Sequence, residues 1–122
     1  MSKSKAKGTA WESEVVAALR RYKTEIPGGY QLAHWPNAER RALQGTLDKG
    51  DITGIPGVMI ECKAEKAITL AEYAKQVEVQ TTNAGADIGA CWIKRRGKAK
   101  AEDGYVVMSG DTFMRLLADT AY

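Results

Sequence analysis

Histidine and cysteine are scarce in this sequence. Its 122 residues contain one histidine, His34, and two cysteines, Cys62 and Cys91. A structural zinc site needs about four histidine or cysteine ligands, so this count argues against one. The cysteines form no CxxC pair, and each lies within an apolar run, where a buried thiol behaves as a small hydrophobe. We therefore expect two reduced core cysteines.

Long apolar segments are also missing. No run approaches the roughly 20 residues that span a bilayer. The lysine-rich start, residues 1–8, has no apolar segment of the kind found in signal peptides. We therefore expect a cytoplasmic protein with no membrane partner. A chain of 122 residues with 44% hydrophobic content is the size of a single domain with its own core.

The positive charge is small but unevenly distributed. The net charge is +3. Clusters of basic residues suit a polyanion, because each neutralised phosphate releases condensed counterions. For any single cluster the alternative is solvated surface charge, but four of them on a short chain favour nucleic acid. The clusters are Lys3, Lys5 and Lys7; Arg20, Arg21 and Lys23; Arg40 and Arg41; and Lys94, Arg95, Arg96, Lys98 and Lys100.

Hydrophobic periodicity and turn residues predict an α/β domain. We expect a flexible basic tail over residues 1–8 and one domain over 9–122. Capping-box spacings, Thr9 with Glu12 and Thr69 with Glu72, mark two helix starts. Residues 36–50 are irregular and predict a functional loop with one helical turn near 38–43. The expected elements are a helix over 10–22, strands over 30–35, 51–53 and 58–63, a helix over 70–84, strands over 88–93 and 104–108, and a helix over 111–118.

This order, α-β-β-β-α-β-β-α, implies a mixed central sheet flanked by helices. The strand 58–63 carries the chemistry, because its side chains alternate between two faces. Val58, Ile60 and Cys62 form an apolar face, which places Glu61 and Lys63 together on the other. The alternative is an ordinary ion pair on an exposed strand.

Two further acids can join Glu61. A hairpin turn at 54–57 would bring Asp51 beside it, although Asp51 could instead only cap that turn. Glu12 borders the apolar stripe of the first helix, where capping by the Thr9 box is an alternative and compatible role. Close carboxylates repel unless a cation lies between them, and Mg²⁺ prefers such oxygen ligands. Metal-assisted phosphodiester hydrolysis would follow, with Lys63 stabilising the negative charge that develops.

Three segments together resemble the PD-(D/E)XK nuclease superfamily, and within it the archaeal and phage-type Holliday junction resolvases. These are Lys7-Gly8-Thr9-Ala10-Trp11-Glu12, Gly50-Asp51-Ile52 and Ile60-Glu61-Cys62-Lys63. The sequence departs from the family pattern in having Gly50 where relatives have proline, and in a short turn between Asp51 and Glu61. Neither departure removes a chemical group.

The resemblance implies a restriction-endonuclease-like core with Glu12, Asp51 and Glu61 as metal ligands and Lys63 as the catalytic lysine. It implies that Gln76 supports the site, with Gln80 one turn away as a rival. The cofactor would be Mg²⁺, with Mn²⁺ able to substitute, and no small-molecule cofactor is expected.

The resemblance further implies a homodimer acting on a four-way DNA junction, in DNA recombination and, if the protein is phage-encoded, in the host cytoplasm. Two alternatives stay open. One is a restriction-like or repair nuclease that cuts unbranched DNA, and the other is a non-catalytic nucleic-acid-binding module. Trp35 is a candidate for base stacking. The candidate DNA contacts are Lys7, Arg40, Arg41, Lys94, Arg95 and Arg96.

Overall fold

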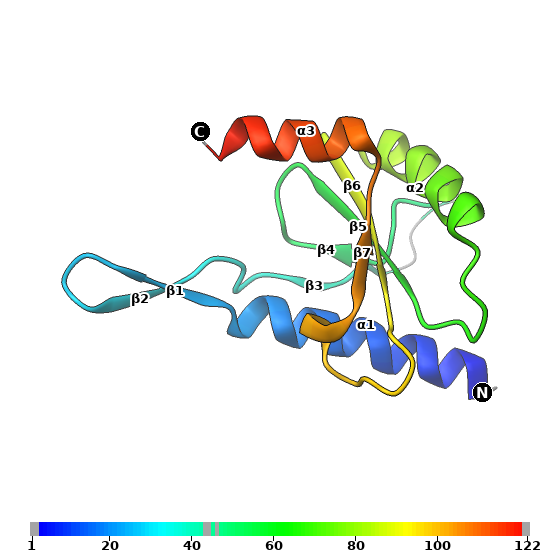
Figure 1. Ribbon diagram of the computed structural model, residues 1–122, viewed down its shortest axis with the longest axis horizontal. Helices are drawn as coiled ribbons and strands as arrows, with labels where there is room; N and C mark the ends of the chain where they lie inside the picture. Colours follow the sequence, from blue (N-terminus) through cyan, green and yellow to red (C-terminus); the bar gives the residue numbers. More distant parts are fainter. Residues whose placement is uncertain (1–2, 43–44, 46, 121–122) are drawn as a thin grey trace.

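The computed structural model describes residues 3–42, 45 and 47–120, with side chains from residue 6 onward. It is a mixed α/β fold (Figure 1). The elements are α1 (Lys3–Arg21), β1 (Lys23–Ile26), β2 (Tyr30–Ala33), β3 (Glu39–Arg40), β4 (Ile52–Thr53), β5 (Val58–Lys63), α2 (Leu70–Ala84), β6 (Ile88–Ile93), the 3-10 turn η1 (Ala101–Asp103), β7 (Tyr105–Val107) and α3 (Gly110–Asp119).

The main sheet has the strand order β3-β4-β5-β6-β7. Its central strands β5 and β6 are parallel, while β3, β4 and β7 run antiparallel to their neighbours. The parallel pair is joined by α2, the crossover helix that parallel strands require. The predicted α/β class with a mixed sheet is thus confirmed.

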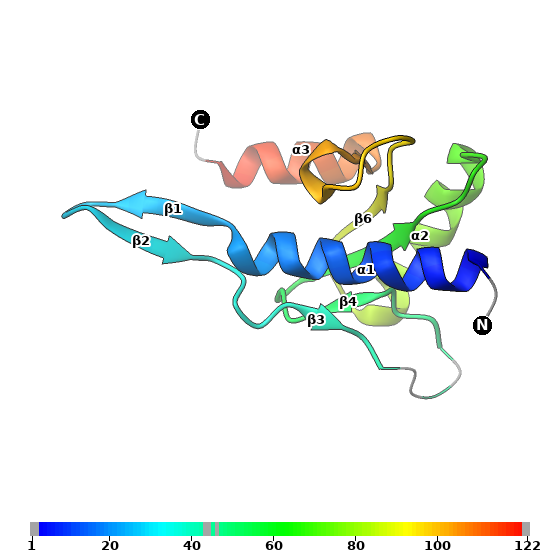
Figure 2. The ribbon, with the colours of Figure 1, turned by 90° about the horizontal axis from the view of Figure 1, so that it is seen from below.

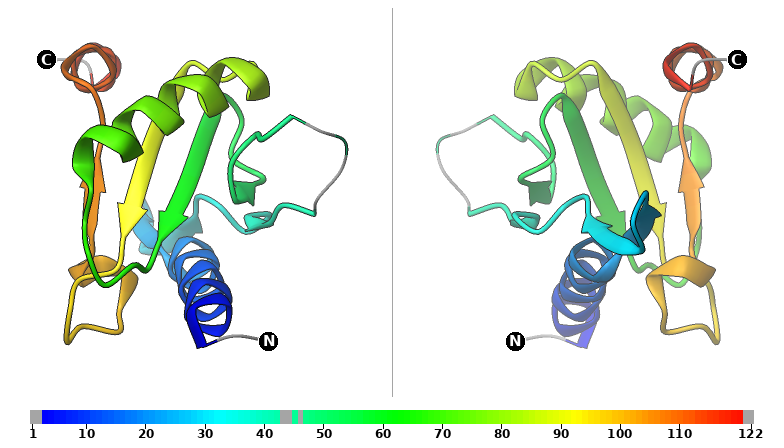
Figure 3. Two further views of the ribbon diagram at one scale, coloured as in Figure 1. Left: turned by 90° about the vertical axis from the view of Figure 1, so that its right-hand side faces the viewer. Right: turned by 90° about the vertical axis from the view of Figure 1, so that its left-hand side faces the viewer.

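Both faces of β5 are covered, which places the core on two sides of the sheet. Ile60 packs against α1 in a cluster that includes Trp11, Val15 and Leu19. Met59, on the opposite face and fully buried, packs against Tyr73 and Val77 of α2. Figures 1 and 3 show α1 and α2 on opposite sides of the sheet. The face that carries Glu61 is therefore interior.

The first helix begins earlier than predicted. α1 starts at Lys3, so residues 3–8 are helical and the expected flexible tail is wrong for them; residues 1–2 lie outside the described part. The helical cost of Gly8, about 1 kcal/mol relative to alanine, is offset by the lysines and alanine around it. Thr9 consequently lies inside the helix and cannot be its N-cap.

The start of α2 is where the sequence predicts it, but the cap differs. Thr69 occupies the N-cap position of α2, yet its side chain makes no capping hydrogen bond. Ser109 does cap α3, since its side chain accepts a hydrogen bond from the Thr112 N–H at 3.1 Å.

A two-stranded hairpin forms an arm that projects from the body (Figure 2). β2 covers most of the predicted strand 30–35, whereas β1 was not predicted, because Lys-Thr-Glu-Ile has little apolar character. Cross-strand pairing of Ile26 with Tyr30, and of Thr24 with Leu32, gives the arm one largely apolar face. Its apolar residues are exposed, Tyr30 by 71%.

The irregular stretch 36–50 contains the short strand β3 in place of the expected helical turn near 38–43; Leu43 lies outside the described residues. Trp11 and Trp92 are packing residues. The Trp11 indole donates to the Trp92 carbonyl at 2.9 Å, and the Trp92 indole donates to the Ala101 carbonyl at 2.9 Å.

Within the described residues, no helix has the length and apolar character that a membrane crossing demands.

Gly50 holds the approach to β4 in a conformation that favours glycine. Its φ is +89°, and a Cβ there would lie 2.5 Å from the Met59 sulfur and 3.0 Å from the Ile60 carbonyl oxygen. Gly97 is a matched control, because its φ is +77° and nothing lies within 4 Å of its Cβ position. Both Gly→Ala changes introduce backbone strain, but only the first adds a clash with buried atoms.

We predict that Gly50→Ala lowers the free energy of unfolding by about 1–3 kcal/mol more than Gly97→Ala does, the usual cost of overpacking. Denaturant unfolding of the two variants measures the difference. Equal losses would show that the segment before Asp51 adjusts without cost.

Candidate active site

Glu61 is a buried acid at the contact between β5 and α2. Its side chain lies on the α2 face of β5 and is 5% exposed. One carboxylate oxygen, Oε2, accepts a hydrogen bond from Gln76 Nε2 at 3.1 Å and another from Gln80 Nε2. Both Gln76 and Gln80, the two rival candidates from the sequence, therefore contact this acid.

Asp51 lies immediately before β4 and beside Glu61. Its N–H donates to the Ile60 carbonyl at 2.9 Å, which continues the antiparallel pairing of β4 with β5. Its Oδ2 accepts from the Cys62 N–H at 2.8 Å. The carboxylate is thus tied to the neighbouring strand rather than to the turn at 54–57, so the capping alternative is wrong.

Glu12 brings a third carboxylate from α1. Its side chain is 19% exposed, and its Oε2 lies 3.6 Å from Arg40 Nη2. Burial, followed by the nearby Asp51, raises the pKa of Glu12, while Arg40 opposes this shift. Asp51 thus has two acid neighbours, Glu12 from the helix and Glu61 from the strand. Because Glu12 is within α1 rather than in its first turn, the capping alternative is wrong here too.

Glu12, Asp51 and Glu61 line a cleft with a volume of about 820 Å³. Arg40 and Arg41 are on its wall, and the Arg41 Nε is buried with no hydrogen-bond partner among the described residues. A cleft that combines acids with arginines can hold a cation and a phosphate together. The described residues that line it are Gly8, Thr9, Glu12, Arg40, Arg41, Ala42, Gly45, Leu47, Asp48, Lys49, Gly50, Asp51, Thr53, Glu61 and Gln76.

Lys63 follows Glu61 on the same strand face but does not line this cleft. Its Nζ is 3.7 Å from Glu65 Oε1 and 5.3 Å from the centre of the Tyr73 ring. The lysine charge still reaches the site, since it opposes the rise in the pKa of Glu61 and contributes to the lowered pKa of Asp48. The structure therefore brings together the three predicted acids and Gln76, and leaves Lys63 beside them.

The candidate DNA contacts divide into two groups. Arg40 and Arg41 line the cleft, whereas Lys7 and residues 94–96 do not. The basic end of β6 adjoins the end of β5, where the Lys94 N–H donates to the Lys63 carbonyl at 2.8 Å. The Trp35 ring stacks on the Tyr22 ring, with 5.4 Å between the ring centroids, so Trp35 already has an aromatic partner.

The donor chemistry of the cleft fits a hard divalent cation. Burial, followed by the Asp51 carboxylate, raises the pKa of Glu61 to about 8. A divalent ion bound by carboxylate oxygens would remove this penalty. Within the described part of the chain, however, no three acidic, histidine or cysteine side chains form a ready-made metal cage. The residues present fit such an ion by their chemistry.

Asp48 is a residue of the site that sequence reasoning missed. It lines the cleft and accepts hydrogen bonds from the Gly50 N–H at 3.0 Å and from Gln80 Nε2 at 2.8 Å. Burial alone would raise the pKa of Asp48, but these hydrogen bonds outweigh burial and lower it. The available signal was its spacing, an acid three residues before Asp51 across a glycine.

The cysteines are free. Burial raises the pKa of Cys91 to about 12 and raises that of Cys62 further still, so both thiols stay protonated at neutral pH. Neither cysteine is among the described residues that line the cleft.

Comparisons of the chain with models of protein families, with curated proteins and with solved structures found no match.

Glu61 gives the metal-free protein a defined pH dependence. Its pKa in the folded state is about 8, above the ordinary value of 4.5. Stability linked to this group is therefore fully present below pH 4.5 and is lost as the pH rises through about 8. Glu61→Gln, which cannot ionise, should lack this loss.

We predict that, in EDTA, the thermal midpoint of the wild type falls between pH 5 and pH 9 relative to that of Glu61→Gln. Glu25→Gln on β1 is the control, because this exposed acid is remote from the cleft. If the wild-type and Glu61→Gln curves stay parallel, the buried acid is not the cause.

Proposed function

We propose that this protein is a divalent-metal-dependent endonuclease that hydrolyses phosphodiester bonds in branched DNA, including four-way junctions. The observation that carries the proposal is that Glu12, Asp51 and Glu61, with Asp51 near both of the others, line one cleft together with Arg40 and Arg41. Acids alone would suit many cations. The adjacent arginines add recognition of a phosphate, which a nuclease needs beside its metal.

Each side chain has a physical role in this proposal. Asp51 and Glu61 hold the ion, and Glu12 completes or tunes the site. Bound Mg²⁺, or Mn²⁺ in its place, would polarise the scissile phosphate and supply a nucleophilic water at neutral pH. Gln76 and Gln80 orient the Glu61 carboxylate, because both donate to its Oε2.

Arg40 and Arg41 contact phosphate oxygens and position the strand. Lys63 stabilises the charge that develops on the phosphate, which requires its Nζ to leave Glu65. That carboxylate is 56% exposed, so breaking the pair costs under about 1 kcal/mol. Further along the duplex, Lys7 and the basic segment Lys94–Arg96, which follows β6, would bind the DNA backbone, a contact that does not depend on base sequence.

The arrangement of elements supports a restriction-endonuclease-like core. α1 carries the first acid, the second lies immediately before β4, the third is on β5, and α2 leads into the parallel strand β6. This is also the order of the three sequence segments that resemble PD-(D/E)XK nucleases. Cleavage of cytoplasmic DNA in recombination is the corresponding biological role.

Cleavage of a DNA panel with Mg²⁺ or with EDTA tests the proposal. The panel is a four-way junction, a flap, a nicked duplex and a linear duplex. We predict junction cleavage that needs Mg²⁺, is lost in Asp51→Asn, and falls at least about 100-fold in Lys63→Ala, the scale of losing a group that stabilises transition-state charge.

Asp119→Asn on α3 and Lys75→Ala on the exposed face of α2 are matched controls and should cut normally. Equal cutting of linear duplex would favour a restriction-like or repair nuclease. Binding of DNA without cleavage of any substrate would identify a non-catalytic nucleic-acid-binding module.

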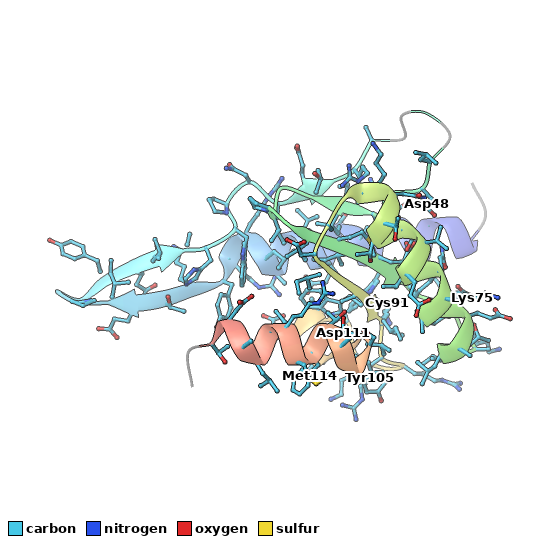
Figure 4. All side chains as sticks on the ribbon, turned by 90° about the horizontal axis from the view of Figure 1, so that it is seen from above. Asp48, Lys75, Cys91, Tyr105, Asp111 and Met114 are labelled. Atoms are coloured by element: carbon cyan, nitrogen blue, oxygen red, sulfur yellow. The ribbon has the colours of Figure 1, made fainter. Side chains whose placement is uncertain are left out.

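A homodimer is part of the proposal, and an exposed apolar surface supports it. Phe113, Met114 and Leu117 of α3 are 48–62% exposed, and Tyr105 and Val106 of the edge strand β7 are 46–47% exposed. Figure 4 shows Met114 and Tyr105 along the same margin of the fold. Large exposed apolar patches usually mark interfaces, and an edge strand beside a helix can pair with its copy about a two-fold axis.

We predict that the wild type is a dimer by light scattering after size-exclusion chromatography, and that Phe113→Asp makes it a monomer. Val79→Asp on α2, where the wild-type side chain is 57% exposed, is the control and should stay dimeric. A Phe113→Asp protein that remains dimeric would place the interface elsewhere.

A further inference from the structure

The segment that leads to Asp51 is attached to α2 by hydrogen bonds that the proposed chemistry does not require. Asp48 Oδ2 accepts from Gln80 Nε2 at 2.8 Å, and the Asp48 backbone carbonyl accepts from Asn83 Nδ2 at 3.0 Å. Figure 4 shows Asp48 beside α2. From this anchored residue the chain reaches Asp51 across only Lys49 and Gly50.

The amide of Gln80 connects two carboxylates that belong to different parts of the chain. The same Nε2 donates to Asp48 and to Glu61 Oε2. An amide nitrogen carries two hydrogens, and here each of them is donated to a different carboxylate. The opposite amide orientation would direct an oxygen at two carboxylates and is repulsive. The two acids therefore determine how this side chain lies.

This orientation has a cost. Gln80 is 1% exposed, and its Oε1 has no hydrogen-bond partner among the described residues. A buried acceptor without a partner costs about 1–3 kcal/mol. An apolar side chain at this position would avoid that cost but would leave Asp48 and Glu61 without their shared donor.

Gln76, Gln80 and Asn83 lie at i, i+4 and i+7 on α2, which places them on one stripe of the helix. All three donate to oxygen atoms of Glu61 or Asp48. Amides orient carboxylates without neutralising them, whereas lysine or arginine at these positions would compete with a cation for the same charge. The stripe thus holds the acids in place and leaves their charge available.

We propose that Gln80 and Asn83 are positioning residues that hold the Asp48–Asp51 segment against β5, and so set the separation of the Asp51 and Glu61 carboxylates that bind the metal ion. The inference rests on the proposed function for the role of that ion. Gly50 contributes through its positive φ, which turns the chain from the anchored Asp48 back to Asp51. Neither Gln80 nor Asn83 touches the phosphate.

Calorimetric titration with Mn²⁺, without DNA, measures the proposed effect directly. Asn83→Ala removes one anchor from a partly exposed site, so the protein should still fold. Gln80→Met removes the other with little change in volume. Thr82→Ala is the matched control, because among the described residues the Thr82 hydroxyl bonds only to the Glu78 carbonyl of its own helix.

Each anchor variant should bind Mn²⁺ at least about 10-fold more weakly, the usual effect of removing a group that orients metal ligands. The double variant should lose less than the product of the two single losses, because both residues act on one segment. In cleavage assays the variants should need more Mg²⁺, recover at high Mg²⁺ and keep the wild-type KM for DNA. Thr82→Ala should match the wild type in every measurement.

Unchanged Mn²⁺ affinity in Asn83→Ala and Gln80→Met would overturn the inference, even if their thermal midpoints fall, and would leave the nuclease proposal intact. Weaker Mn²⁺ binding in a protein that cuts no DNA would support the positioning role and reject the nuclease. A wild type that binds no Mn²⁺ would overturn both.

Discussion

The burial of one carboxylate, Glu61, between a strand and a helix is the constraint on which the rest of the site depends. Removing an acid from water is costly unless its charged form is hydrogen-bonded or paired. Here α2 supplies two amide donors from Gln76 and Gln80. The second acid, Asp51, lies close enough to make ionisation of Glu61 harder. The fold thus keeps an unfavourable charge arrangement that a cation would relieve.

The framework around these acids is rigid for a simple reason. β5 is covered on both faces, by α1 through Ile60 and by α2 through Met59. A strand packed on both sides cannot shift its register without moving both cores. Glu61 and the Cys62 N–H that binds Asp51 are therefore fixed together, which ties the β4 side of the site to the same framework.

The basic side chains near the site differ in which acids they contact. Arg40 lies against Glu12, whereas Lys63 lies against Glu65 and Tyr73 at the edge of the site. The three predicted acids are held near one another largely by neutral groups, namely backbone N–H groups and side-chain amides. The acids and the two arginines therefore share the cleft, while Lys63 lies outside its lining.

Local pattern in the sequence was enough to predict the main helices and strands and the nearness of Asp51 to Glu61. Periodicity reports which face of an element is apolar. Because the turn that follows Asp51 is short, the returning strand β5 must place Glu61 near Asp51. Where elements are weakly patterned it failed: β1 was missed because Lys-Thr-Glu-Ile carries little apolar signal, and α1 begins before Thr9 because good helix formers precede it.

Only the tertiary structure decided which distant groups meet at the acids. Asp48 and Asn83 are 35 residues apart, and Gln80 touches both Asp48 and Glu61, which no local spacing indicates. The direction of Lys63 toward Glu65 and Tyr73 also depends on where α2 packs. Sequence spacing determines which side chains share a face, while the packing of one element on another determines what that face contacts.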